Sequence, residues 1–377
     1  MIAAAVIITL LYALSMLFLL YGFFQVQGFS GKNSAPKTHF SIVIPYRDEA
    51  ENLQELFDSL LKLKYPAEMF EILAVDDASE DKSAELWQDF RKEHPQLNIR
   101  LLQNIRKTGS PKKDALSLAI SASEYDYILT TDADCVVPQA WLESFSSKIE
   151  ETGAKVIAAP VALKPEVSKM SFLRGFQEMD ILSLQAATIG SFGVDLPFMC
   201  NGANFCYSKK AFLEVGGFEG NRNFAGGDDI FLLEKFRQRG LHPVFLKSQE
   251  AIVKTSATWS WSGLFSQRVR WAAKAAAYKS HFSKSLGLLV FLMNILLVIV
   301  TIGTIAAAFP VWLLSFMFLI KFNVDFFLIY NSAKFFDREP AVKSYFLSSM
   351  IYPFFSSWVV INSVFSGFRW KGRAFKK

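Results

Sequence analysis

Apolar and polar positions divide this chain into two kinds of segment, beginning with a long apolar one. Residues 1–31 carry no charged side chain, and the run from Ile2 to Phe24 exceeds the roughly 20 residues that a helix needs to cross a bilayer. A cleaved signal peptide would have a basic start and a shorter apolar core, so the pattern favours an N-terminal transmembrane helix. Lys32, Lys37 and Arg47 follow it and indicate that the next segment is cytoplasmic.

Two more uncharged stretches lie near the end of the sequence. Pro310 divides the first into two expected helices, and Pro353 interrupts the second, residues 344–368. We expect a C-terminal membrane region over 286–368 with two to three helices. Three spans would export the C-terminus, whereas the basic tail 369–377 indicates that it is inside. Either the last run is a re-entrant hairpin, or one apparent span lies in the membrane interface.

Between these apolar regions, residues 38–285 alternate strand-like and helix-like patterns. Residues 50–63 have apolar side chains at helical spacing, and residues 70–75 form a short apolar run typical of a buried strand. Further along we expect a strand over 155–162 and a helix over about 167–188. Such alternation is typical of an α/β domain with a mainly parallel sheet. The expected domain is cytoplasmic and ends in an amphipathic interface helix.

Acidic side chains follow two of the expected strands. Asp76 and Asp77 come directly after one, and Asp132 and Asp134 follow the strand-like run 125–129. If the backbone stays extended, Asp132 and Asp134 point the same way, because side chains two apart lie on one face of a strand. Paired carboxylates suit Mg²⁺ or Mn²⁺ together with substrate phosphates, and open α/β sheets bind ligands at this edge. The alternative makes each acid a cap or turn residue.

Two later stretches add charge to this picture. Residues 107–113 form a basic, turn-rich loop before a helix, and Lys112 with the helix N–H groups would suit a phosphate. A solvated basic loop is an equal alternative for this stretch alone. Gly227-Asp228-Asp229 places two acids at the start of a helix, where the helix dipole stabilises negative charge. Capping explains one of these acids but does not readily explain both.

A third stretch combines a cation with an aromatic ring. On a helix, Gln267, Arg270 and Trp271 share one face with Lys274 and Tyr278, at spacings of three and four residues. This face offers a planar cation for phosphate oxygens and a flat ring for a sugar. A basic amphipathic helix on the membrane surface would use the same residues, so both interpretations stay open.

Composition supports membrane contact and excludes some classes of site. The chain has 51% hydrophobic residues and 37 Phe, which exceeds what a core alone requires. A net charge of +5, not gathered into one long basic run, makes nucleic acid an unexpected partner. The three cysteines have neither CxxC nor Cys/His spacing, which argues against a zinc site and a disulfide framework and fits a reducing compartment.

Taken in order, these stretches resemble the motifs of membrane-integrated family 2 glycosyltransferases of the GT-A fold, the group of bacterial cellulose and hyaluronan synthases. The resemblance covers roughly residues 38–285 and the flanking membrane helices. The motifs that carry it are Asp76-Asp77-Ala78-Ser79, Lys112-Lys113-Asp114-Ala115-Leu116, Asp132-Ala133-Asp134, Gly227-Asp228-Asp229 and Gln267-Arg268-Val269-Arg270-Trp271.

The resemblance implies a role for each matching residue. Asp76 and Asp77 would lie near the base and ribose of a nucleotide-sugar donor, and Lys112 near the donor. A divalent metal, Mg²⁺ or Mn²⁺, would join Asp132 and Asp134 to the diphosphate. The remaining assignments are Asp229 as general base with Asp228 beside it as the second candidate, Arg270 on the diphosphate, and Trp271 with Gln267 on the acceptor.

The resemblance also implies a function. We expect an inverting, metal-dependent glycosyltransferase of the hexosyltransferase type that uses a nucleotide-sugar, a UDP-sugar first, at the cytoplasmic face of the cell (inner) membrane. Its acceptor would be lipid-linked or a glycan, in polysaccharide or glycolipid biosynthesis. The alternative is a catalytically inactive membrane component that binds a nucleotide or a partner. A nucleotidyltransferase would need an early Gly-rich phosphate loop, which is absent after Ile44.

Overall fold

The computed structural model describes residues 1–31, 36–165, 171–221, 226–274, 277–365, 368–370 and 373–375. Lys32 and, within the basic tail, residues 371–372 and 376–377 lie outside the described residues. The chain divides into two compact units. The sheet unit comprises residues 27–164 and 199–256, and the helical unit comprises residues 1–26, 165–198 and 257–377.

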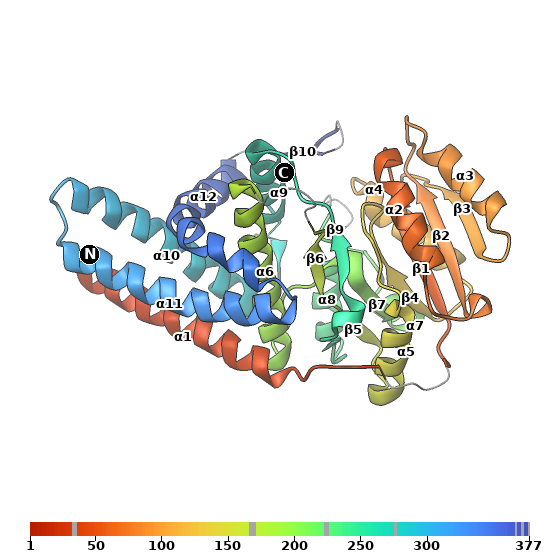
Figure 1. The fold of residues 1–377 in the computed structure, drawn as a ribbon, viewed down its shortest axis with the longest axis horizontal. Coiled ribbons are helices and arrows are strands. Elements are labelled where there is room, and N and C mark those ends of the chain that lie inside the picture. The colour runs from red at the N-terminus through yellow and green to blue at the C-terminus, as the bar shows by residue number, and fades with distance from the viewer. Residues whose placement is uncertain are drawn as a thin grey trace. The chain divides into compact units, whose positions relative to one another are not determined.

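The sheet unit contains a seven-stranded sheet in the order β3-β2-β1-β4-β7-β5-β8 (Figure 1). Its strands are β1 (Phe40–Tyr46), β2 (Phe70–Asp76), β3 (Asn98–Gln103), β4 (Tyr127–Thr130), β5 (Val156–Ala158), β7 (Phe205–Ser208) and β8 (Val244–Phe245). Strand β7 runs antiparallel to β4 and β5, and the other pairings are parallel. The mainly parallel sheet expected from the sequence is therefore confirmed.

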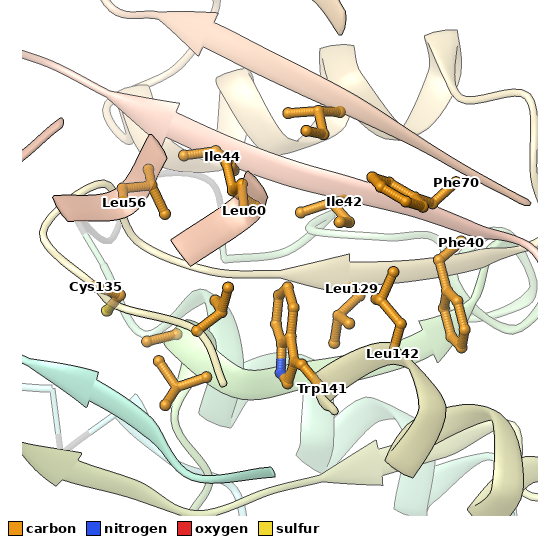
Figure 2. Packing of buried hydrophobic residues seen from close by; sticks show 14 of the residues in the cluster. Phe40, Ile42, Ile44, Leu56, Leu60, Phe70, Leu129, Cys135, Trp141 and Leu142 are labelled. Atoms are coloured by element: carbon orange, nitrogen blue, oxygen red, sulfur yellow. The ribbon is translucent and has the colours of Figure 1, made fainter. Parts of the chain in front are cut away.

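Helices follow the strands as the alternating pattern indicates. They are α2 (Ala50–Leu61), α3 (Ser83–Glu93), α4 (Pro111–Ala122), α5 (Trp141–Thr152), α7 (Lys209–Glu214) and α8 (Asp228–Gln238). Figure 2 shows the apolar core between β1 and its covering helices, where Phe40, Ile42 and Ile44 meet Leu56 and Trp141. These side chains are fully buried, so burial of apolar surface holds β1 and its neighbours in place.

The strand expected over 155–162 is two strands in different sheets. Strand β5 belongs to the large sheet, whereas β6 (Val161–Leu163) pairs in parallel with β9 (Val253–Thr255). Pro160 separates them, and proline cannot donate a ladder hydrogen bond. The Pro160 carbonyl accepts a hydrogen bond from the Asn204 side chain at 2.8 Å. After Pro160 the chain leaves the large sheet, and β6 pairs with β9.

The helical unit contains long apolar helices from both ends of the chain. Its main helices are α1 (Ile2–Gln25), α6 (Phe172–Gly193), α9 (Trp261–Ala272), α10 (His281–Ile305), α11 (Val311–Phe335) and α12 (Tyr345–Phe365). Within the described residues, four segments are long and apolar enough to cross a membrane: Ile2–Gln25, His281–Ile305, Val311–Phe335 and Glu339–Phe365. The hairpin alternative for the last run does not hold, because α12 continues as one helix through Pro353.

Helix α6 packs against α1 through glycines. A Cβ added at Gly22 of α1 would meet the Gly190 carbonyl, and one added at Gly193 of α6 would meet the Gly22 carbonyl. Such small residues allow two helix backbones to approach closely, as in membrane helix pairs. Helix α6, expected within the domain of residues 38–285, belongs to the helical unit.

The two charged side chains within the apolar part of α11, Lys321 and Asp325, pair with each other and contact α1. Lys321 forms an ion pair with Asp325 one turn later and donates to the Tyr12 hydroxyl at 3.2 Å. The Tyr12 hydroxyl in turn donates to Asp325 Oδ1 at 2.7 Å. Ionisable side chains in a membrane-spanning helix are costly unless they pair in this way. The residues that interrupt the apolar pattern of α11 thus join it to α1.

Candidate active site

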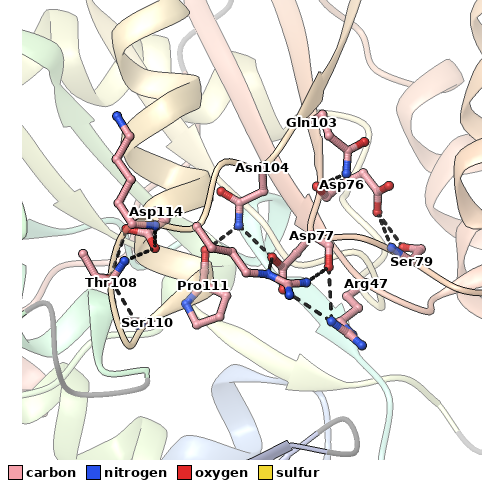
Figure 3. A network of polar contacts seen from close by, with 12 residues as sticks. Arg47, Asp76, Asp77, Ser79, Gln103, Asn104, Thr108, Ser110, Pro111 and Asp114 are labelled. Carbon is pink, nitrogen blue, oxygen red and sulfur yellow. Dashed lines mark hydrogen bonds and ion pairs between the residues drawn. The ribbon is translucent and has the colours of Figure 1, made fainter.

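The carboxyl end of β2 carries a network of charged side chains, drawn in Figure 3. Asp76 Oδ1 accepts from the Ser79 backbone N–H at 2.9 Å and from the Ser79 hydroxyl at 2.7 Å, which closes the turn after the strand. Asp77 Oδ1 accepts from Arg106 Nε at 2.6 Å and from Asn104 Nδ2 at 2.8 Å. The Asp77 side chain is buried, so the two donors offset the cost of removing its charge from water.

Two arginines of this network, Arg47 and Arg106, were not among the site residues predicted from the sequence. Arg106 keeps 39% of its side chain exposed while it holds Asp77, and Arg47, at the end of β1, lies 3.9 Å from Asp77 Oδ2. A nucleotide at this strand end would therefore meet cations as well as the acids. The sequence could have identified both residues, because Arg47 follows β1 and Arg106 follows β3, and neighbouring parallel strands end at one edge of a sheet.

The Asp132-Ala133-Asp134 stretch is a turn and not a strand end. Strand β4 stops at Thr130, and the Cys135 N–H donates back to the Asp132 carbonyl at 3.1 Å. The expectation that an extended backbone pairs the two side chains is thus wrong. Burial, then the charge of Asp132, then that of Glu49 raise the pKa of the Asp134 carboxyl above its ordinary value.

Lys112 links two motifs that lie nearly a hundred residues apart in the chain. It projects from the first turn of α4, and its ammonium Nζ lies 2.7 Å from Asp132 Oδ1 and 3.4 Å from Asp228 Oδ2. Burial lowers the pKa of the Lys112 ammonium, but the charges of Asp132 and Asp228 outweigh that effect and hold it above its ordinary value. The structure therefore assembles three of the predicted residues around one positive charge.

Asp228 and Asp229 occupy different environments at the start of α8. Asp228 is buried, whereas Asp229 is partly exposed. Asp229 Oδ2 accepts from the Gly202 N–H at 2.9 Å, and the Gly202 carbonyl accepts from the Thr130 hydroxyl at the end of β4 at 2.6 Å. A Cβ at Gly202 would lie 3.0 Å from Asp228 Oδ2, so a side chain at this position would require the Asp228 carboxylate to shift by a few tenths of an ångström. Gly202 thus holds the more accessible acid beside the β4 end.

The donor set fits a divalent cation only together with a ligand. Within the described ranges, no group of three or more His, Cys, Asp or Glu side chains is arranged to hold a metal ion. Asp132 and Asp134 supply hard carboxylate oxygens, and Mg²⁺ commonly takes one or two carboxylates with its other positions filled by waters and substrate phosphates. Asp134 Oδ2 also accepts from Thr255 Oγ1 at 3.2 Å, which orients that carboxylate. These residues fit the expected cofactor in the presence of a diphosphate.

The remaining predicted residues, Gln267, Arg270 and Trp271, lie on α9 of the helical unit. Lys274 and Tyr278 were expected on the same helix face. They lie beyond the end of α9 at Ala272, so they do not extend that face. Each of the three side chains is partly exposed.

Comparisons with known proteins find glycosyltransferases. The family model described as glycosyl transferase family 21 matches residues 6–376. The expected resemblance to glycosyltransferases is therefore confirmed, although the motifs were compared with those of family 2. Glycosyltransferase AglE of Haloferax volcanii is 31% identical over 121 residues, which is 32% of this chain and 38% of AglE. A poly-β-1,6-N-acetyl-D-glucosamine synthase of Staphylococcus epidermidis is 32% identical over 97 residues, 26% of this chain and 22% of the synthase. These alignments span well under half the length of either relative.

A solved structure shares the fold. It is the mannosyltransferase PcManGT from Pyrobaculum calidifontis in complex with GDP-Man and Mn²⁺, with a TM-score of 0.59 at 16% sequence identity. The match covers 93% of this chain and 99% of that protein, and it confirms the GT-A fold. Four helices of this chain are also long and apolar enough to cross a membrane. Since the family model extends over almost all of its residues, the chain belongs to glycosyl transferase family 21.

Proposed function

We propose that this protein transfers a sugar from a nucleotide-diphosphate donor to a lipid-linked or glycan acceptor, with inversion at the anomeric carbon. The observation that carries the proposal is the convergence of Lys112, Asp132 and Asp228 beside Asp229 in the sheet unit. A purely structural role would not require acids from two distant motifs to share one lysine at the carboxyl end of the sheet. The mannosyltransferase with the same fold was solved with a nucleotide-sugar and Mn²⁺, which supports a donor of this class.

Each residue then has a definite task. Asp76 and Asp77 lie at the β2 end, where they would bind the nucleoside with Arg47 and Arg106 close by. Lys112 would turn from Asp132 toward the donor diphosphate, because the diphosphate carries two negative charges and the carboxylate it leaves carries one. A bound Mg²⁺ or Mn²⁺, held by Asp132 and Asp134, would supply charge neutralisation of the leaving diphosphate.

The proton transfer falls to Asp229. Its carboxylate is partly exposed, whereas Asp228 is buried and faces Lys112, so Asp229 is the acid that an acceptor hydroxyl can approach. It would take the proton of that hydroxyl as the oxygen attacks the anomeric carbon, which requires a distance of about 3 Å. Arg270 would bind the diphosphate, and Gln267 with Trp271 would bind the acceptor sugar or headgroup.

The four long apolar helices fit an integral membrane protein. We place the sheet unit at the cytoplasmic face of the cell membrane, where nucleotide-sugars are made, in agreement with Lys37 and Arg47 after the first helix.

A donor screen tests the proposal. The full chain in detergent is supplied with UDP-glucose, UDP-N-acetylglucosamine and GDP-mannose, with Mg²⁺ or Mn²⁺ and membrane lipid extract, and release of nucleoside diphosphate is measured. We expect turnover with one donor that is lost in Asp229→Asn and retained in Asp89→Asn, an exposed acid on α3 that pairs with Lys92. No turnover with any donor, or equal rates in both variants, would overturn the proposal.

A further inference from the structure

Arg268 lies between the predicted site residues of α9 but is not one of the residues assigned to their shared face. The helical pattern assigned Gln267, Arg270 and Trp271 to one side and left Arg268 without a role. In the structure the Arg268 side chain is only 8% exposed, which is unusual for a cation and requires a partner.

One guanidinium group contacts three side chains. Arg268 Nε and Nη2 both lie 2.5 Å from Asp180 Oδ2 on α6. Its Nη1 donates to Gln267 Oε1 at 2.5 Å, and its Cζ lies 4.1 Å from the centroid of the Trp271 ring. The two residues assigned to the acceptor are therefore both attached to Arg268.

Asp180 fixes the direction of that guanidinium. Its side chain is 3% exposed, so its carboxylate is buried together with the guanidinium that it binds. A buried carboxylate without its cation costs several kcal/mol, so the pair stays formed. The planar fork of arginine, unlike the ammonium of lysine, can bind Asp180 with one edge and direct its remaining N–H groups and its flat face elsewhere.

We propose that Arg268, held by Asp180, is a positioning residue that sets the orientation of Gln267 and Trp271 toward the acceptor. The inference rests on the proposed function, which assigns those two residues to the acceptor. The contact with Trp271 places the cation against the ring face and fixes the ring plane.

The contact with Gln267 also determines what the amide offers. Because Oε1 of Gln267 accepts from Arg268, its Nε2 group remains as the donor for other partners. The acceptor group bound there is therefore a hydrogen-bond acceptor, such as a hydroxyl, ether or phosphate oxygen.

The decisive experiment compares Arg268→Lys with a matched control on α6. Arg268→Lys keeps the charge beside Asp180 but loses the fork, so the KM for the acceptor rises about tenfold. The KM for the donor and the slow acceptor-independent hydrolysis of the donor stay within about twofold of the native values. Asp180→Glu, which keeps the charge but moves it by one methylene, shows the same selective change and serves if Arg268→Lys does not fold.

The control is Glu178→Gln. Glu178 is also buried on α6 and pairs with Arg174 and Arg338, so its loss tests removal of a buried ion pair from the same helix. We expect Glu178→Gln to lower the melting temperature without raising the acceptor KM. An unchanged acceptor KM in Arg268→Lys, or the same rise in Glu178→Gln, would overturn the proposal.

A spectroscopic readout separates this inference from the proposed function. The emission of Trp271 is obtained by subtracting the spectrum of Trp271→Phe, in the native background and in Arg268→Lys. Loss of the guanidinium contact shifts that emission, and Glu178→Gln leaves it unchanged. A shift in a protein that turns over no donor would leave Arg268 in its positioning role and refute the proposed function, whereas an unshifted spectrum would refute the positioning role alone.

Discussion

The two units use ion pairs in opposite ways. In the sheet unit, Lys112 and Asp132 are 23% and 35% exposed, and the lysine has a flexible stem and shares its charge between two acids. In the helical unit, Arg268 and Asp180 are 8% and 3% exposed and are joined through a rigid fork. A partly exposed lysine can exchange one anion for another, whereas a buried arginine pair persists.

This difference predicts where function and stability separate. Changes to the partly exposed charges of the sheet unit, Lys112 and Asp132, should alter catalysis while the fold remains intact, because water and ligands can replace the lost partner. Changes to the buried pairs of the helical unit should appear first as lost stability, or as a change in the geometry of the residues that the pair holds.

The largest effect is expected from Asp229→Asn. An amide has nearly the shape of the carboxylate but cannot take the proton of the acceptor hydroxyl, so kcat falls by about 10²- to 10⁴-fold. The melting temperature changes little, since Asn can still accept from the Gly202 N–H. Steady-state release of nucleoside diphosphate measures kcat. If kcat of Asp229→Asn fell by less than tenfold, the general base would be another residue. If only Asp228→Asn lost kcat by about 10²-fold or more, the base would be Asp228.

Metal removal should follow, with a dependence on Asp132. Chelation of divalent ions lowers turnover, because the leaving diphosphate then lacks its counter-charge. Addition of Mn²⁺ or Mg²⁺ restores the rate. Asp132→Asn lowers kcat/KM by about 10²-fold and raises the metal concentration needed for half-maximal rate. Titration of Mn²⁺ measured by its electron paramagnetic resonance signal gives binding independently of turnover. Full activity in chelator would contradict the assigned cofactor.

Lys112→Met should have a smaller effect on the donor alone. The variant loses one cation for the donor phosphates, and kcat/KM for the donor falls about tenfold, near the value of one charge-assisted hydrogen bond. Lys113→Met is the control, because Lys113 is buried and donates to the Asn221 carbonyl at 2.8 Å. Lys113→Met should lower the melting temperature more than Lys112→Met does, and it should lower kcat/KM for the donor less. The reverse order would show that Lys112 is the structural lysine of the two.

The sequence predicted most of what depends on local pattern. The helix expected over 50–63 is α2, and the strand expected over 70–75 is β2, because apolar spacing and burial coincide in these segments. The acids after β2 and β4 were found in the same way. What escaped was the shape of the Asp132-Ala133-Asp134 turn, since the hydrogen bond that closes it joins two backbone groups, the Cys135 N–H and the Asp132 carbonyl.

Features that depend on distant partners could not be read from the chain. Helix α6 contains Arg174, Glu178 and Asp180, which lower its hydropathy and give it the pattern of a soluble helix. Only the folded chain shows that these charges pair with one another and with Arg268, which lies 88 residues away from Asp180. The role of Arg268 was missed for the same reason.

The smallest predicted effect concerns the charges within the apolar helices. Tyr12→Phe removes the hydroxyl that donates to Asp325 and accepts from Lys321, yet leaves the ion pair itself. Hydrogen bonds between membrane helices contribute about 0.6 kcal/mol on average, so the free energy of unfolding should fall by roughly that amount. Titration with denaturing detergent measures it, and kcat should not change. Tyr21→Phe is the matched control, because Tyr21 lies on the same helix with 59% of its surface exposed and should show no loss. If Tyr12→Phe lowered kcat while leaving stability intact, the buried charges of the helical unit would take part in the reaction and the division between exchangeable and permanent pairs would fail.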